Sequence, residues 1–146
     1  MNKNEMKVEF VSKSVNEGFA RAVISSFAAQ LDPTIEEISD IKTAVSEAVT
    51  NSIIHGYPNV EGRIIMKAKI IGDELEIEIS DNGIGIEDVE KAKEPLFTTK
   101  GEFERSGMGF VIMESFMDDL NVESIIGLGT KITMKKKIKK FAFSNK

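Results

Sequence analysis

Residues 63–80 read RIIMKAKIIGDELEIEIS, and this stretch decides the class of fold. Apolar and polar side chains alternate through it, with the pair Gly72-Asp73 in the middle. A period of two is typical of a strand with one buried and one solvated face, and a Gly-Asp pair between two such runs predicts a tight turn. The stretch therefore predicts an antiparallel hairpin whose apolar face must be covered by other elements.

Two amphipathic helices are predicted before the hairpin, over residues 14–31 and 34–56. Each begins with the pattern of a capping box, Ser-Val-Asn-Glu at 14–17 and Thr-Ile-Glu-Glu at 34–37. Pro33 separates the helices and is compatible with the first turn of the second. Phe19, Phe27 and Leu31 are expected in the core.

The remaining segments complete an α+β pattern. They are expected as a strand at 6–11, a short helix at 87–93, a helix at 107–119 with Val111, Ile112 and Phe116 inward, and strands at 121–126 and 130–138. Helices and antiparallel strands in this order favour a single domain over residues 1–146. We predict a two-layer α/β sandwich with helices on one face of a mainly antiparallel sheet.

Composition excludes several functions. The chain has no Cys and one His, so a Cys-based zinc site, a His cluster and thiolate chemistry are excluded. The net charge of −5 argues against direct nucleic-acid binding. No apolar run reaches the ~20 residues of a membrane span, and the first ten residues lack the apolar core of a signal peptide, so a cytoplasmic protein is expected. The lysines near the C-terminus are interpreted as a solvated edge strand and tail.

Two groups of residues could carry chemistry in the first part of the chain. In EAVTNSIIH, residues 47–55, Glu47, Asn51 and His55 form one row along the second helix, drifting from the side opposite the apolar stripe towards its edge. By itself this row is also compatible with an ordinary solvated face. Asp81-Asn-Gly83-Ile-Gly85 follows a strand, where two glycines permit close approach of a ligand, although the same residues are common in turns.

Two further groups lie downstream. Ser106-Gly107-Met108-Gly109 begins a helix, whose free N–H groups suit a phosphate, or it is a glycine hinge with Ser106 as cap. Gly127-Leu-Gly129-Thr130 is either a hairpin turn or a place where the Thr130 hydroxyl lies beside a bound base. The segment from about 87 to 106 has little periodicity and is interpreted as a lid. Its hydroxyl and cationic side chains, which could reach phosphates, are Thr98, Thr99, Lys100 and Arg105.

Together and in this order, the four groups resemble the N box and the three glycine boxes of the GHKL ATPase superfamily, which includes gyrase and the histidine kinases. Within it, EAVTNSIIHGY at 47–57, EPLFTTKGEFERSGMGF at 94–110 and IMESFMDDL at 112–120 resemble the anti-sigma factor serine kinases. The likeness covers essentially the whole chain and implies a Bergerat-type ATP-binding fold.

The resemblance also implies roles for the residues. Asn51 would ligate Mg²⁺, and Asp81 would bind the amino group of adenine, with Gly83, Gly85 and Thr130 lining the base pocket. Gly107, Met108 and Gly109 would donate backbone N–H groups to the phosphates of ATP or ADP. Arg105, and Lys100 with it, would neutralise charge on the γ-phosphate. Glu47 would be the catalytic base, while His55 is either near the metal or a cap of the helix C-terminus.

The family binds and inhibits an RNA polymerase sigma factor and phosphorylates an anti-anti-sigma protein on serine. We therefore expect both partners, and a homodimer, with Arg21 on the first helix as the place to look for a partner contact. The alternative is a binding module in which ATP only sets the conformation that holds a partner. A histidine autokinase fragment is disfavoured because the only histidine, His55, lies in the N box.

Overall fold

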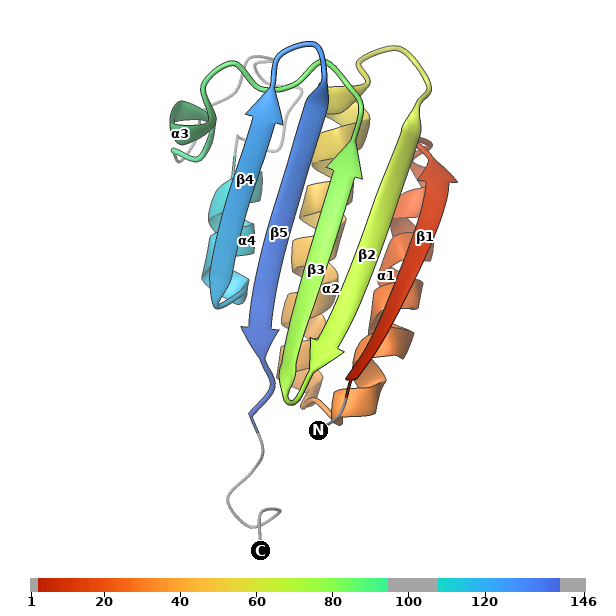
Figure 1. Ribbon diagram of the computed structural model, residues 1–146, viewed down its shortest axis with the longest axis vertical. Coiled ribbons are helices and arrows are strands. Elements are labelled where there is room, and N and C mark those ends of the chain that lie inside the picture. Colours follow the sequence, from red (N-terminus) through yellow and green to blue (C-terminus); the bar gives the residue numbers. More distant parts are fainter. Residues whose placement is uncertain (1–2, 95–107, 140–146) are drawn as a thin grey trace, which may run out of the picture.

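The structure is a computed structural model that describes residues 3–94 and 108–139. Five strands form one sheet in the order β1-β2-β3-β5-β4, every neighbouring pair is antiparallel, and the helices lie on one face (Figure 1). The predicted α+β two-layer sandwich is confirmed. The elements are β1 Lys3–Val11, α1 Val15–Ala28, a 3₁₀ turn Ala29–Leu31, α2 Ile35–Asn51 with a π-helical end Ser52–Gly56, β2 Arg63–Ile71, β3 Glu74–Asp81, α3 Val89–Ala92, α4 Gly109–Phe116, β4 Asp119–Ile125 and β5 Gly129–Lys137.

The predicted hairpin is β2 and β3. Ile71 pairs with Glu74, so two residues make the turn, and Gly72 takes the left-handed backbone conformation at φ +65° that such a turn requires. The alternating apolar side chains all face the helices and are buried. They are Ile64, Met66, Ala68, Ile70, Leu75, Ile77 and Ile79.

The opposite face of the sheet carries charges in cross-strand pairs. Lys67 on β2 lies 3.9 Å from Glu78 on β3, and Lys135 on β5 lies 3.9 Å from Glu76 on β3. β5 therefore lies inside the sheet, between β3 and β4, and the interpretation of the Lys-rich stretch as an edge strand is wrong. Residues 140–146 of the expected tail lie outside the described residues.

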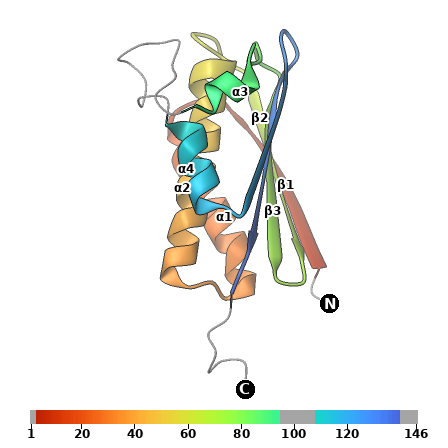
Figure 2. The same ribbon diagram turned by 90° about the vertical axis from the view of Figure 1, so that its left-hand side faces the viewer.

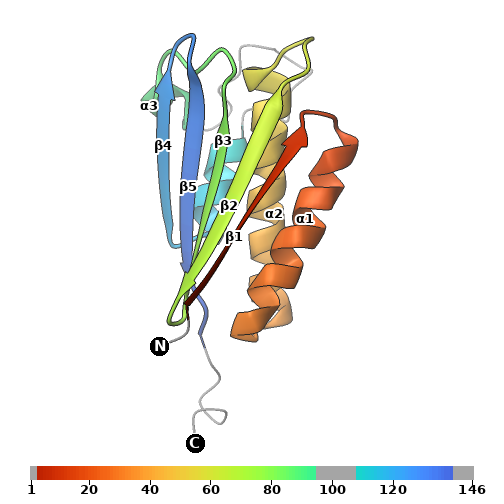
Figure 3. The ribbon, with the colours of Figure 1, turned by 45° about the vertical axis from the view of Figure 1, so that its right-hand side comes forward.

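The helix layer has α2 in its centre, with α1 on one side and α4 on the other (Figures 2 and 3). Because α4 covers the side of α2 that the sequence pattern assigns to solvent, Glu47 is only 7% exposed. The row of Glu47, Asn51 and His55 is therefore not a solvated face. This arrangement places a carboxylate between two helices, and that burial needs a chemical reason.

The helix starts only partly follow prediction. Thr34 and Glu37 form both bonds of a capping box, at 3.0 and 2.9 Å, with Pro33 just before the cap instead of in the first turn. Ser14 forms no side-chain cap, so the capping box predicted at residues 14–17 is wrong. The Glu17 carboxylate instead accepts a hydrogen bond from Ser46 on α2, and this bond ties α1 to α2.

The inward faces of two helices also differ from prediction. The buried residues at α4 are Phe110, Met113 and Met117, not Val111, Ile112 and Phe116, which are only partly buried. The predicted face is displaced because α4 packs on both α2 and β4 and so buries a different side. On α1, Leu31 and Phe27 pack in or against the core as expected, but Phe19 is 48% exposed and touches Phe10 edge to face. Among the described residues, no helix is long and apolar enough to span a membrane.

Candidate functional site

The site begins where α2 changes its winding. Asn51 is the last α-helical residue, and Ser52–Gly56 continue as a π-helix. Short π-helical segments are rare and occur frequently at functional sites, because the wider turn redirects side chains. Asn51 and His55 are half-buried here, while Ser52 is buried and faces the sheet.

Asp81, the last residue of β3, receives the side chain of Ser52. The Ser52 hydroxyl donates to Oδ2 of Asp81 at 2.7 Å, and the backbone N–H of Gly83 donates to Oδ1 at 2.9 Å. Asp81 is 6% exposed, so its carboxylate is desolvated and held by two donors. Ser52 is not among the site residues predicted from the sequence, although a hydroxyl directly beside Asn51 on an amphipathic helix was a usable signal.

The two glycines of the first glycine box, Gly83 and Gly85, are required by packing. A Cβ on Gly83 would lie 2.1 Å from the carbonyl oxygen of Gly56, and one on Gly85 would lie 2.5 Å from the carbonyl oxygen of Ile125. The same Gly56 carbonyl accepts the N–H of Ile84 at 2.9 Å. The loop after β3 is therefore wedged between the end of α2 and the end of β4, which holds it at the rim of the sheet.

The third glycine box, Gly127-Leu-Gly129-Thr130, lies on the other side of Asp81. Thr130 pairs with Asp81 across β5 and β3, and a Cβ on Gly129 would lie 2.0 Å from the Asp81 carbonyl oxygen. The hydroxyls of Thr130 and Ser124 are 2.8 Å apart, and Ser124 also accepts the N–H of Ile86 at 2.6 Å. Asp81, Gly83, Gly85 and Thr130 are therefore brought together as predicted. Ser124, which connects them, was not anticipated.

The described part of the second glycine box, Met108 and Gly109, lies beside the buried Glu47 carboxylate of α2. A Cβ built on Gly109, the first residue of α4, would lie 3.4 Å from Oε1 of Glu47. Met108 precedes it as the N-cap and forms no side-chain cap bond, so the first turn of α4 is not capped by its own side chain. The Glu47 carboxylate of α2 therefore lies beside the N-terminal end of α4, the end at which a helix leaves backbone N–H groups without intrahelical partners.

Several predicted site residues lie outside the described residues: Thr98, Thr99, Lys100, Arg105, Ser106 and Gly107. The part of the predicted lid that is described contains the short helix α3. Within residues 3–94 and 108–139, no group of three or more His, Asp or Glu side chains could hold a metal ion. The amide oxygen of Asn51 is chemically suited to Mg²⁺ that is bound to phosphates, because Mg²⁺ prefers oxygen ligands and keeps several waters in such sites.

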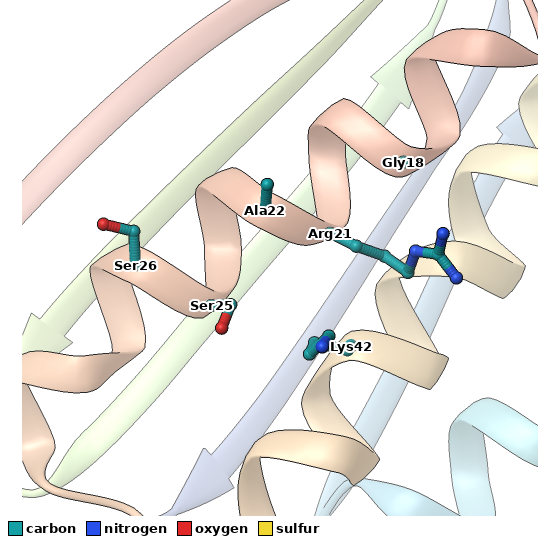
Figure 4. Close-up of a pocket in the computed structure, with 6 residues that line it drawn as sticks. All are labelled: Gly18, Arg21, Ala22, Ser25, Ser26 and Lys42. Carbon is teal, nitrogen blue, oxygen red and sulfur yellow. The ribbon is translucent and has the colours of Figure 1, made fainter.

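Arg21 lies elsewhere, in a groove between α1 and α2. The groove is lined by Gly18, Arg21, Ala22, Ser25, Ser26 and Lys42 (Figure 4). The Arg21 guanidinium is 3.4 Å from the carboxylate of Glu17, which also accepts from Ser46. The groove therefore has two cations along a stretch of small side chains.

Comparisons with known proteins found relatives that cover most of the chain. Residues 12–136 match the model of the histidine kinase-like ATPase domain. The chain is 62% identical over 136 residues to an anti-sigma F factor of Clostridium perfringens SM101, covering 92% of this chain and 97% of that protein. It is 63% identical over 135 residues to an anti-sigma F factor of Thermoanaerobacter sp. X514, covering 92% and 94%.

Solved structures share the fold at low identity. The RsbU and RsbW domains of Rv1364c from Mycobacterium tuberculosis superpose with a TM-score of 0.70 at 19% identity, covering 95% of this chain and 34% of that longer one. The catalytic domain of the histidine kinase ThkA gives a TM-score of 0.59 at 15% identity, covering 91% and 96%. The chain belongs to the histidine kinase-like ATPase family and, within it, to the family of the anti-sigma F factors.

Proposed function

We propose that the protein is an anti-sigma factor of a sporulation system that holds a sigma factor, the sigma F type, and uses Mg-ATP to phosphorylate a serine of its anti-anti-sigma antagonist. The observation that carries the kinase half of this proposal is Glu47, a carboxylate 7% exposed beside the first residue of α4. Nucleotide binding by itself does not require a carboxylate at the phosphate end of the site. A base that accepts the proton of an attacking hydroxyl does require one.

The nucleotide would lie along the rim formed by the three glycine boxes. Asp81 would accept a hydrogen bond from the amino group of adenine, and this preference selects ATP over GTP. Because the Ser52 hydroxyl and the Gly83 N–H hold the two oxygens of the Asp81 carboxylate, this carboxylate is already oriented before adenine binds. Thr130 would lie beside the base, and the N-terminus of α4, with Met108 and Gly109, would face the phosphates.

Phosphoryl transfer would then proceed as follows. Asn51 would ligate Mg²⁺, and the ion supplies charge neutralisation on the phosphates when it is bound. Glu47, one helical turn before Asn51, would accept the proton of the serine hydroxyl. The bond from the serine oxygen to the γ-phosphorus forms while the bond from that phosphorus to the leaving oxygen of ADP breaks. Arg105 and Lys100, outside the described residues, are proposed to stabilise the charge on the transferred group.

The partner half of the proposal is supported by the relatives, which are named anti-sigma F factors. We propose the groove of Arg21 and Lys42 as a contact for acidic side chains of the partner, because both cations lie beside small residues that permit close approach. Replacing Arg21 with Glu reverses the charge, so loss of sigma-factor capture is the expected result. The protein is proposed to act in the cytoplasm as a homodimer.

The kinase proposal is tested with Mg-ATP labelled on the γ-phosphate and a purified anti-anti-sigma protein. Wild-type protein should yield acid-stable phosphoserine, and Glu47→Gln should reduce the transfer rate by roughly 10²–10⁴-fold while ATP still binds. Glu114→Gln, which changes an exposed carboxylate on α4, is the matched control and should transfer at the wild-type rate. If wild type transfers no phosphate but holds a partner in an ATP-dependent manner, the alternative of a binding module is correct. Undiminished transfer by Glu47→Gln would remove Glu47 as the base.

A further inference from the structure

Tyr57, the only tyrosine of the chain, is buried beside the loop that follows β3. It comes directly after the π-helical end of α2 and is 8% exposed. Its hydroxyl donates to the backbone carbonyl of Arg63 at 2.6 Å and accepts from the backbone N–H of Asn82 at 2.8 Å. Since a carbonyl only accepts and an N–H only donates, both directions are fixed. This single hydroxyl therefore links two backbone segments.

The two segments lie opposite one another in the sheet. β2 begins and β3 ends at the same end of the molecule (Figure 1), where the ladder between these strands pairs Ile64 with Asp81. One step further along the same register, Arg63 lies opposite Asn82. The Tyr57 hydroxyl is therefore inserted between two facing backbone groups at the point where the pairing of β2 with β3 stops.

This position in the ladder is one where a direct backbone bond is expected. The pair that closes a two-residue turn is hydrogen-bonded, and here that pair is Ile71 with Glu74. Hydrogen-bonded pairs then recur at every second step of an antiparallel ladder, and this sequence of pairs reaches Arg63 and Asn82. The Tyr57 hydroxyl thus replaces one N–H···O bond with two, and it holds the ends of β2 and β3 apart immediately beside Asp81.

The end of α2 fixes the loop after β3 at three successive points. Each point is a hydrogen bond, and the three join Ser52 to Asp81, Tyr57 to Asn82, and Gly56 to Ile84. The Tyr57 N–H also donates to the Ser52 carbonyl at 3.0 Å, which closes the π-helical turn. The Ser52 bond orients the Asp81 carboxylate, whereas the Tyr57 bonds set the spacing of the backbone that carries it.

The ring of Tyr57 is confined by its surroundings. A Cβ on Gly62 would collide with this ring, so the glycine leaves the space that the ring occupies. A buried ring held in one place fixes its hydroxyl before any ligand binds, and such preorganisation reduces the ordering cost of binding. Tyr57 and Gly62 therefore act together on the position of Asn82.

We propose that Tyr57 is a positioning residue that determines base preference. Its hydroxyl sets the spacing between the ends of β2 and β3, and so places the Asp81 carboxylate where the amino group of adenine meets it. This role rests on the proposed function, in which Asp81 reads that amino group. Because the bonds of Tyr57 lie at the base end of the site, loss of its hydroxyl changes the choice between bases and leaves phosphoryl transfer from bound ATP unchanged.

Tyr57→Phe tests this role by calorimetry with Mg-ATP and with Mg-GTP. The variant keeps the ring, but the Asn82 N–H and the Arg63 carbonyl must then close on one another or take up water, and Asp81 moves with its neighbour. ATP binding should weaken about tenfold, whereas GTP binding, which gains nothing from Asp81, should change less than about twofold. In the phosphate-transfer assay, KM for ATP should rise by a similar factor at unchanged kcat.

Ser12→Ala is the matched control. The Ser12 hydroxyl accepts the Gly62 N–H at 2.9 Å, so this variant also removes a hydroxyl that is bonded to backbone at the start of β2. Its bond lies between the chain after β1 and the chain before β2, not between β2 and β3. Ser12→Ala should therefore lower the free energy of unfolding and leave the ratio of ATP to GTP affinity unchanged.

Gly62→Ala reaches the same contact by a second route, because its methyl group displaces the Tyr57 ring and leaves the hydroxyl in the chain. It should lower the ratio of ATP to GTP affinity in the same direction as Tyr57→Phe. Equal weakening of both nucleotides, or an unchanged ratio in both variants, would show a general structural role and overturn the proposal while the proposed function stands. A wild-type protein without preference for ATP would overturn base reading by Asp81 and this role of Tyr57 together.

Discussion

Gly83→Ala is the substitution whose cost follows most directly from the structure. Its methyl group would lie 2.1 Å from the carbonyl oxygen of Gly56 and 2.5 Å from the carbonyl carbon. Ordinary contact begins at 3.4 Å, so the loop after β3 and the π-helical end of α2 must separate by more than one ångström. A movement of that size breaks the bond from the Ile84 N–H to the same carbonyl, now 2.9 Å long.

The expected loss of stability combines two effects. Overpacking a close-packed contact costs typically about 1–3 kcal/mol. Losing one buried hydrogen bond costs a further ~0.5–1.5 kcal/mol. We therefore expect Gly83→Ala to lower the free energy of unfolding by about 2–4 kcal/mol and the melting temperature by about 5–15 °C. Binding of ATP should weaken as well, because the same movement withdraws the Gly83 N–H from Asp81.

The assay is urea denaturation followed by circular dichroism, with Gly18→Ala as the matched control. Gly18 lies inside α1, and a methyl there would meet nothing closer than the end of the Arg21 side chain, at 3.7 Å. Since Ala is the better helix former, this control should raise the free energy of unfolding by roughly 0.5–1 kcal/mol. A loss below about 1 kcal/mol for Gly83→Ala, with an unchanged slope against urea, would refute the claim that this glycine is required by packing.

Three further substitutions separate binding from stability. Ser52→Ala removes the hydroxyl that donates to the buried Asp81 carboxylate, so it should lower the free energy of unfolding in urea by about 1.5–3 kcal/mol and weaken ATP binding in calorimetry. The control Ser26→Ala, on the exposed face of α1, should change neither quantity. Thr34→Ala removes the confirmed cap of α2 and should cost about 0.5–2 kcal/mol with ATP affinity unchanged, because the cap is at the other end of the helix; weakened ATP binding would contradict this separation. Asn51→Ala should weaken ATP binding in the presence of Mg²⁺ and have little effect on it when the metal is chelated. Equal weakening of ATP binding in both conditions would exclude Asn51 as a ligand of Mg²⁺.

The sequence alone determined the local elements and the order of the boxes. The hairpin at 63–80 was predictable because a strand with one buried face repeats every two residues, whatever covers it. The Thr34 cap was predictable because its bonds join residues only three apart. The association of Asp81 with Gly83, Gly85 and Thr130 followed from their place at strand ends and from the resemblance to a known family.

Only the tertiary structure decided which of those elements touch. The sequence pattern of α2 could not reveal that α4 would cover Glu47. Its apolar stripe indicates one buried face, and it does not show which further helix packs on another side of α2. The lysines of β5 resembled an edge strand, and only the sheet order placed them between β3 and β4. The bond between Ser52 and Asp81 joins residues 29 apart, and its formation depends on the packing of a π-helix against a strand. Contacts of this kind depend on the three-dimensional arrangement, and no local periodicity in the chain encodes them.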